Sequence, residues 1–361
     1  MNHNMNYKTI LISILIFIST IVLLDRYLNL TRITPPVLKY YNEEFGALNA
    51  PNIDYLKFRE SIFLGSTNYD GRFRENYPKK KADSSILRIV LIGDSFVEGI
   101  DVFGRDHFAA YMERLISKEL NRKVEILNFG RGNCTLQASS FYFLNYIKKE
   151  YDVDLALYFV EARDVSPVTD YPSTAFTVDE ATENLVPSYS WNESQVYKLT
   201  KMLSNWNVLS FLNSSGIFRL TYRARSGLIM YGFWPKVLGK VYGEIPTQSY
   251  NFTKQNDEVS KISTKIFDTL SKQTNPKVLF VIRNFPIESS NLENFMDKMS
   301  YRHVNLKDTF DNKLIRNTKD DAFYFKATGL YGGHWNHLGH KAVGYFLSTK
   351  VINSFREGDM K

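Results

Sequence analysis

The sequence predicts an α/β fold in which a parallel sheet is flanked by helices. Short apolar runs alternate along the chain with longer segments that carry apolar residues at helical spacing. Strands that alternate with helices form right-handed βαβ units, and such units build a parallel sheet. The chain has 361 residues, 44% of them hydrophobic and 15% aromatic, which suits one large domain with insertions or two domains.

Five apolar runs are expected to form the strands of this sheet. Each run is short and largely apolar, as is typical of a strand buried on both faces. In chain order the expected strands are 87–92, 124–129, 155–160, 278–282 and a shorter one at 304–306. Apolar residues at helical spacing predict helices at 108–120, 135–149, 258–270, 290–299 and 340–355.

The alternation of strands and helices holds in only part of the chain, and this predicts the domain organisation. The middle of the chain lacks it and carries Trp and Tyr residues with Pro-bearing turns, so we expect an inserted cap or subdomain there. The expected regions are a membrane anchor at 1–30, a stalk leading into the domain at 31–85, the α/β domain at 86–165 and 258–361, and the insertion at 166–257.

Residues 9–24 are apolar apart from Thr and Ser, with Lys8 before them and Asp25 and Arg26 after them. Sixteen residues are few for a membrane-spanning helix, and no A-x-A-like cleavage site follows. We predict an uncleaved anchor that leaves the rest of the chain outside the cytoplasm, in the periplasm or at the cell surface. A cleaved signal peptide and a buried soluble helix are the alternatives.

Charge and cysteine content exclude several kinds of partner. The net charge is +7, with acidic and basic residues mixed throughout, and the dense run Lys79–Lys81 is interpreted as a solvated loop. No nucleic-acid-binding module is present, so we expect no nucleic-acid partner. Cys134 is the only cysteine, which excludes an internal disulfide and a Cys-rich metal site and indicates a small buried filler.

A Gly-Asp-Ser turn that ends in Ser95 directly follows the first expected strand. These are turn formers, so Ser95 could simply end the strand. Alternatively it is a nucleophile at the carboxyl edge of the sheet, where open parallel sheets bind ligands. Gly130 follows the second strand, and Arg163 and Asp164 follow the third, so the same edge receives polar side chains and a glycine N–H that can closely approach a substrate oxygen.

A serine nucleophile needs a neighbouring base, which is usually a histidine. Three of the six histidines, His334, His337 and His340, lie in the stretch GGHWNHLGH just before the last expected helix. A zinc site made by these three is the alternative, because imidazole suits zinc. Their spacing does not put all three on one helical face, and no carboxylate lies in the motif. We therefore expect neither a metal ion nor another cofactor.

The sequence GDSF at 93–96, the glycine after the second strand, and HWNHLGH near the C-terminus together resemble the SGNH (GDSL-like) hydrolases. The resemblance covers about 87–165 and 278–355 and leaves the insertion out. It implies a flavodoxin-like three-layer α/β/α fold. It also implies the activity of an esterase, a lipase, a glycan deacetylase or an acyltransferase.

The resemblance also implies roles for single residues. Ser95 matches the nucleophile and His334 the base, while the N–H groups of Ser95 and Gly130 match two oxyanion donors. Asp94 would hold the turn that presents Ser95, and Asp164 would be structural near the site. The other two histidines would serve local structure.

Two positions depart from the family pattern. Arg163 stands where the family has an oxyanion-binding Asn; Arg can also donate hydrogen bonds, and Asn133 could substitute for it. The acid that usually precedes the catalytic histidine is absent before His334. A backbone carbonyl could orient the imidazole instead, or Asp320 or Asp321 could fold back.

Two functional classes follow from these observations. The first is a membrane-anchored serine esterase outside the cytoplasm that removes or transfers O-acyl groups, such as acetyl, on a cell-envelope polysaccharide. Its partners would be an O-acylated glycan or another ester, and the membrane through the N-terminal helix. The second is a degenerate relative that binds a glycan or a partner protein without turnover. The two classes differ on whether Ser95 can be acylated.

Overall fold

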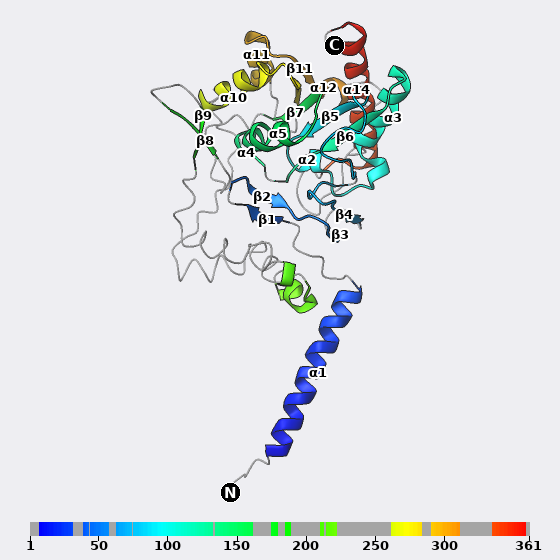
Figure 1. Cartoon of the computed structure of the whole chain (residues 1–361), viewed down its shortest axis with the longest axis vertical. Coiled ribbons are helices and arrows are strands. Elements are labelled where there is room, and N and C mark those ends of the chain that lie inside the picture. Colours follow the sequence, from blue (N-terminus) through cyan, green and yellow to red (C-terminus); the bar gives the residue numbers. More distant parts are fainter. Residues whose placement is uncertain are drawn as a thin grey trace.

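The computed structural model contains a five-stranded parallel sheet with helices on both faces, which confirms the predicted three-layer α/β/α fold (Figure 1). The strand order is β11-β10-β7-β5-β6. The strands are β5 (Leu87–Ile92), β6 (Val124–Asn128), β7 (Leu155–Val160), β10 (Lys277–Ile282) and β11 (His303–Asn305). The structure describes residues 7–31, 39–42, 44–57, 63–73, 75–132, 134–161, 175–179, 185–188, 210–212, 214–221, 261–283, 290–310 and 334–358.

Both faces of the sheet are apolar because successive strand residues point to opposite sides. On β5, Ile89 and Leu91 face the layer formed by α3 (Phe108–Leu120) and α14 (His337–Arg356). Val90 faces the opposite layer. That layer comprises α4 (Leu136–Tyr142), α10 (Lys261–Ser271) and α11 (Ser290–Lys298).

Helix boundaries follow local capping groups. The helix predicted at 340–355 begins three residues earlier, because Asn336 Oδ1 accepts hydrogen bonds from the N–H groups of Leu338 and Gly339. The helix predicted at 135–149 is continuous in direction but contains a π-helical turn at Phe143–Ile147, followed by α5 (Lys148–Glu150). The expected start of α10, at 258–260, lies outside the described residues.

The segment predicted as a stalk is largely packed against the domain. It forms two hairpins: β1 (Lys39–Asn42) with β2 (Gly46–Asn49), and β3 (Asp54–Lys57) with β4 (Phe63–Ser66). Aromatic side chains supply the packing, because Phe45 lies against Phe141 and Tyr142, and Phe63 lies edge-on to Phe103. Of the predicted insertion, the structure describes a hairpin of β8 (Ala175–Val178) and β9 (Leu185–Ser188) and helical residues at 210–212 and 216–221.

The N-terminal apolar stretch forms one helix, α1 (Tyr7–Thr31), that projects away from the α/β domain (Figure 1). Among the described residues it is long and apolar enough to cross a membrane, with a mean hydropathy of 2.3 in its most apolar window and none of that window buried. A signal sequence near the N-terminus has the same properties.

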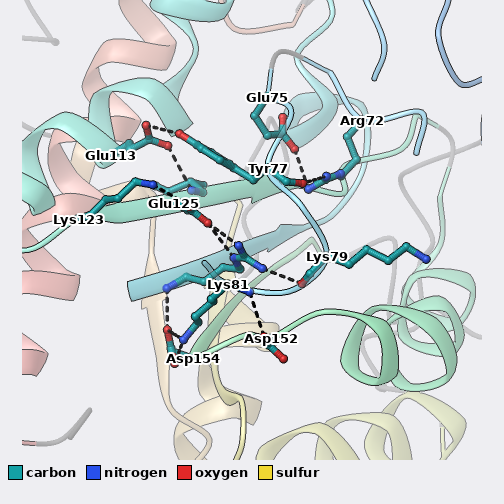
Figure 2. A network of polar contacts seen from close by, with 12 residues as sticks. Arg72, Glu75, Tyr77, Lys79, Lys81, Glu113, Lys123, Glu125, Asp152 and Asp154 are labelled. Atoms are coloured by element: carbon teal, nitrogen blue, oxygen red, sulfur yellow. Dashed lines mark hydrogen bonds and ion pairs between the residues drawn. The ribbon is translucent and has the colours of Figure 1, made fainter. Parts of the chain in front are cut away.

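The outer edge of strand β6 is covered by side chains instead of another strand. Its outward N–H groups at Val124, Ile126 and Asn128 donate to Ser117 Oγ (3.0 Å), Glu113 Oε2 (3.2 Å) and Glu75 Oε1 (3.2 Å). Figure 2 shows Glu113, which also accepts a 2.7 Å hydrogen bond from the Tyr77 hydroxyl. Burial raises the pKa of Glu113, and these hydrogen bonds offset only part of the rise.

A buried ion pair joins β5 to β6. Arg88 and Glu125 are cross-strand neighbours, and the guanidinium, which is fully buried, lies 2.5 Å from Glu125 Oε2. Burial alone would raise the pKa of Glu125, but hydrogen bonds from Arg88 and Lys123 lower it overall. The ion pair therefore stabilises the folded state when both Arg88 and Glu125 are charged.

The lysine run interpreted as a solvated loop makes specific ion pairs. Lys81 Nζ lies 2.6 Å from Asp154, and the same carboxylate accepts the N–H of Arg88. Lys79 and Lys80 pair with acidic residues on the same short stretch of chain, Glu150 and Asp152. The run thus fastens the segment before β5 to the turn before β7.

We expect Arg88→Met to destabilise the protein by about 3 kcal/mol or more, because it leaves the buried Glu125 carboxylate without its buried partner and with only the exposed Lys123 beside it. Adding Glu125→Met should recover much of the loss. The control Lys80→Met breaks an exposed pair and should cost about 1 kcal/mol or less. Denaturant unfolding in detergent measures all of these.

The loss of stability caused by Arg88→Met should also depend on pH. The pKa of Glu125 is lower in the folded state, so its contribution is present above the ordinary Glu range of about 4.3 and is lost as pH falls below it. The difference between wild type and Arg88→Met should therefore narrow in acid. An unchanged difference from neutral pH to well below pH 4 would contradict this account.

Candidate active site

Ser95 is the first residue of α2 (Ser95–Glu98), a single helical turn at the carboxyl end of β5. Asp94 caps this turn, because its Oδ1 accepts the Phe96 N–H at 3.0 Å. The turn ends at Gly99, whose φ of 53° lies in the left-handed region that glycine adopts without strain. The cap and the glycine together keep the turn short, so Ser95 is held at the sheet edge.

The back of this turn is held by two side chains that bond one carbonyl. The Val97 oxygen accepts from Asn128 Nδ2 at 2.8 Å and lies 3.1 Å from His107 Nε2. His107 Nδ1 accepts the Ala109 N–H at the start of α3, so the ring is neutral with its proton on Nε2. The turn that carries Ser95 is thereby tied to β6 and α3.

The structure brings His334 to Ser95 across 239 positions of sequence. His334 Nε2 lies 2.7 Å from Ser95 Oγ, and both side chains are partly exposed. This is the geometry of a nucleophile and its base. The other ring nitrogen, Nδ1, lies 3.8 Å from Asp101 Oδ2. Asp101 is buried, with 3% of its side chain exposed.

Asp101 was not among the residues singled out in the sequence. The sequence pattern predicts an acid shortly before His334, whereas Asp101 lies in the loop after α2. The distance of 3.8 Å is long for a hydrogen bond, and such contacts often tighten when substrate binds. The weak signal was an acid six residues after Ser95, at the same sheet edge. Asp320 and Asp321 lie outside the described residues.

Trp335 positions the loop that carries His334. Its side chain is 1% exposed and meets the rings of Phe96 and Phe108 edge-on. His340 is also buried, stacked on Phe108 at an interplanar angle of 8°. His337 is exposed at the start of α14. The three histidines thus have separate surroundings, and the described part of the chain has no group of three or more His, Cys, Asp or Glu that could hold a metal.

Beneath the turn, one buried arginine joins two carboxylates. Arg283, at the end of β10, lies 2.7 Å from Asp94 Oδ2 and also bonds Glu161, at the end of β7. Its guanidinium stands over the Phe96 ring, 3.9 Å from the centroid. Arg283 therefore links the carboxyl ends of β5, β7 and β10 next to Ser95.

The N–H of Gly130, which is predicted to be an oxyanion donor, donates to Asn128 Oδ1 at 2.9 Å in this structure. A Cβ on Gly130 would lie 2.2 Å from the Glu98 nitrogen, so glycine is needed for close packing against α2. Asn133, Arg163 and Asp164 lie outside the described residues, and Cys134, predicted as buried, is half-buried.

No protein-family model matches the sequence, and no curated protein matches it. Solved structures give distant likenesses. A lipolytic protein of the G-D-S-L family from Desulfitobacterium hafniense DCB-2 has 10% identity and a TM-score of 0.32, over 73% of this chain and 98% of that one. An alpha/beta hydrolase enzyme from the metagenome of Lake Arreo, Spain, has 13% identity and a TM-score of 0.38, over 76% and 99%.

A two-domain esterase active on acetylated mannans, co-crystallised with mannopentaose, has 12% identity and a TM-score of 0.35. The match covers 76% of this chain and 50% of that one. These values describe a distant likeness only, so the function of this chain has to be inferred from the geometry around Ser95.

We expect Asn128→Ala to lower the free energy of unfolding by about 1–3 kcal/mol, because it removes two buried hydrogen bonds, one to the Val97 carbonyl of the turn that carries Ser95 and one from the Gly130 N–H. The matched control is Asn145→Ala, which removes a partly buried bond to the Phe141 carbonyl and an exposed bond from Lys149 and should cost less. Denaturant unfolding of both variants decides the matter. Equal losses would show that the Val97 carbonyl is held well enough without Asn128.

Proposed function

We propose that this protein is a membrane-anchored serine esterase, with Ser95 as nucleophile and His334 as base. The observation that carries the proposal is the 2.7 Å contact between Ser95 Oγ and His334 Nε2. It lies at the carboxyl edge of a parallel sheet, where open α/β folds bind their ligands. The rigid support of the α2 turn adds weight, because a nucleophile must be held in a fixed position.

The proposed reaction is acyl transfer in two steps. Ser95 Oγ attacks the ester carbonyl carbon while its proton passes to His334 Nε2. His334 then gives that proton to the departing alcohol, which leaves an acyl group on Ser95. In the second step water, or a sugar hydroxyl, loses its proton to His334 and attacks the acyl-enzyme, and Ser95 regains its proton. The Ser95 N–H would be one donor to the oxyanion.

We further propose that the substrate is an O-acylated, in particular O-acetylated, cell-envelope polysaccharide on the outer side of the cytoplasmic membrane. The apolar helix α1 supports this location, because an anchored enzyme works near the membrane. Removal of the acyl group and its transfer to another hydroxyl use the same first step and differ in the acceptor.

The first test is acylation of the full chain in detergent by a fluorophosphonate probe, together with hydrolysis of p-nitrophenyl acetate. We expect both in wild type and neither in Ser95→Ala or His334→Ala. Ser85→Ala and His337→Ala, which change exposed residues, serve as matched controls and should keep both. A folded wild-type protein that takes no label would argue against catalysis and favour a protein that binds its ligand without turnover.

We propose that Asp101 is a positioning residue that orients His334 through Nδ1. Asp101→Asn should lower kcat about 10²- to 10⁴-fold with little change in KM, as expected when the imidazole loses the acid that fixes its tautomer. Asp101→Glu should restore part of the rate, and Asp106→Asn, on the following turn, should have no effect. A kcat in Asp101→Asn close to that of wild type would show that another group orients His334.

A further inference from the structure

The end of α1 is bound by residues that lie far away in the sequence. Asp25 Oδ1 accepts hydrogen bonds from Ser215 Oγ (2.7 Å) and the Ile217 N–H (3.1 Å). Asn29 donates to the Ser214 carbonyl at 2.8 Å and accepts from Arg219. We call residues 210–212 and 214–221 the docking segment; Figure 1 shows it beside the last turns of α1.

Apolar packing reinforces these hydrogen bonds. Leu28 is 7% exposed, although most apolar residues of α1 are exposed. A Cβ on Gly216 would lie 2.5 Å from Leu28 Cβ and 3.0 Å from the Asp25 carbonyl, so the two backbones approach as closely as glycine allows. The last turns of α1 are therefore a fitted part of the fold, whereas a signal sequence that is removed needs no such fit.

The length of α1 determines how deep in the bilayer its contact with the docking segment lies. Its apolar stretch, 9–24, has a rise of about 24 Å, whereas the hydrocarbon core of a bilayer is about 30 Å thick. The turn from Asp25 to Asn29 then falls at the outer boundary of the hydrocarbon. Polar groups at that depth are costly without partners, and the docking segment supplies partners to both residues.

The surface around this contact is apolar and exposed. Phe211 and Leu220 of the docking segment are 76% and 43% exposed, and Tyr27 and Leu30 of α1 are 57% and 84% exposed. Tyr is enriched in the interfacial layer of membranes, and exposed apolar side chains such as Phe and Leu favour burial against lipid. This apolar surface is continuous with the apolar surface of α1, so a bilayer that α1 crosses would also cover it.

We propose that the docking segment and the last turns of α1 form one unit seated in the interfacial layer of the bilayer, with Phe211 and Leu220 against lipid. The proposal rests on the membrane anchor of the proposed function and is independent of the esterase chemistry. It means that α1 is retained in the mature protein, and that the docking segment is held at a fixed depth in the interfacial layer.

The test uses nitroxide labels on the full chain in nanodiscs of phosphatidylcholine and phosphatidylglycerol. Cys134 is the only cysteine, so Cys134→Ser gives a background in which Leu220→Cys and, as the distant exposed control, Lys350→Cys are labelled singly. We expect the ratio of collisions with oxygen to collisions with a water-soluble nickel complex to be several-fold higher at 220 than at 350. Equal ratios would overturn the proposal.

A second pair of variants tests the contact itself. Asp25→Leu removes the hydrogen bonds that Ser215 and Ile217 of the docking segment donate to Asp25, and should make the label at 220 more mobile and more accessible to nickel. Asp25→Asn keeps an oxygen at Oδ1 and should behave as wild type. No change in Asp25→Leu, or an intact mass that places the mature N-terminus after Asn29, would overturn the proposal. Hydrolysis of p-nitrophenyl acetate by the same samples tests the esterase separately.

Discussion

The carbonyl of Val97 is the point on which the site depends. It belongs to a single helical turn, and a turn of four residues has too few internal hydrogen bonds to hold its own position. Asn128 and His107 bond that carbonyl from two different elements, and Gly130 lets the chain after β6 pass directly behind it. The position of Ser95 is thus set by β6 and α3 as much as by β5.

Two buried arginines are each paired with carboxylates from other parts of the sheet. Arg88 lies fully buried between β5 and β6 with Glu125 as partner, and Arg283 lies buried beneath Ser95 with Asp94 and Glu161. The Arg88 guanidinium bonds Glu125 and the Lys79 carbonyl, and that of Arg283 bonds carboxylates that follow two different strands. A guanidinium can do this because its fork of donors bonds more than one oxygen at once.

Local pattern predicted most of the fold. The five strands and the helix at 108–120 fall within about a residue of their expected bounds, because continuous apolar runs and helical spacing are properties of neighbouring residues. The Ser95–His334 pair could be expected from two motifs. For Asp101 the sequence held only a weak signal, an acid six residues after Ser95, because its nearness to His334 arises from how two loops fold together.

The same limit explains the other differences. The lysine run was predicted to be solvated because its acidic partners at 150–154 lie about 70 positions away in the sequence. The aromatic packing of the segment predicted as a stalk was missed because its hairpins do not show strong alternation of apolar and polar residues. Gly130 was predicted from its place after a strand, and in this structure its N–H donates to Asn128, two residues earlier. In each case the deciding partner is set by tertiary structure or by a side-chain rotamer that the sequence does not show.

The covered edge of β6 has a consequence for how copies of this protein meet. An open strand edge is a template on which a second chain can add a strand, and this is a common route to aggregation. Here Ser117, Glu113 and Glu75 already occupy the outward N–H groups, and two of the three carry carboxylates that would repel the carbonyls of an approaching backbone. A second chain that approaches this edge therefore finds these N–H groups already bonded.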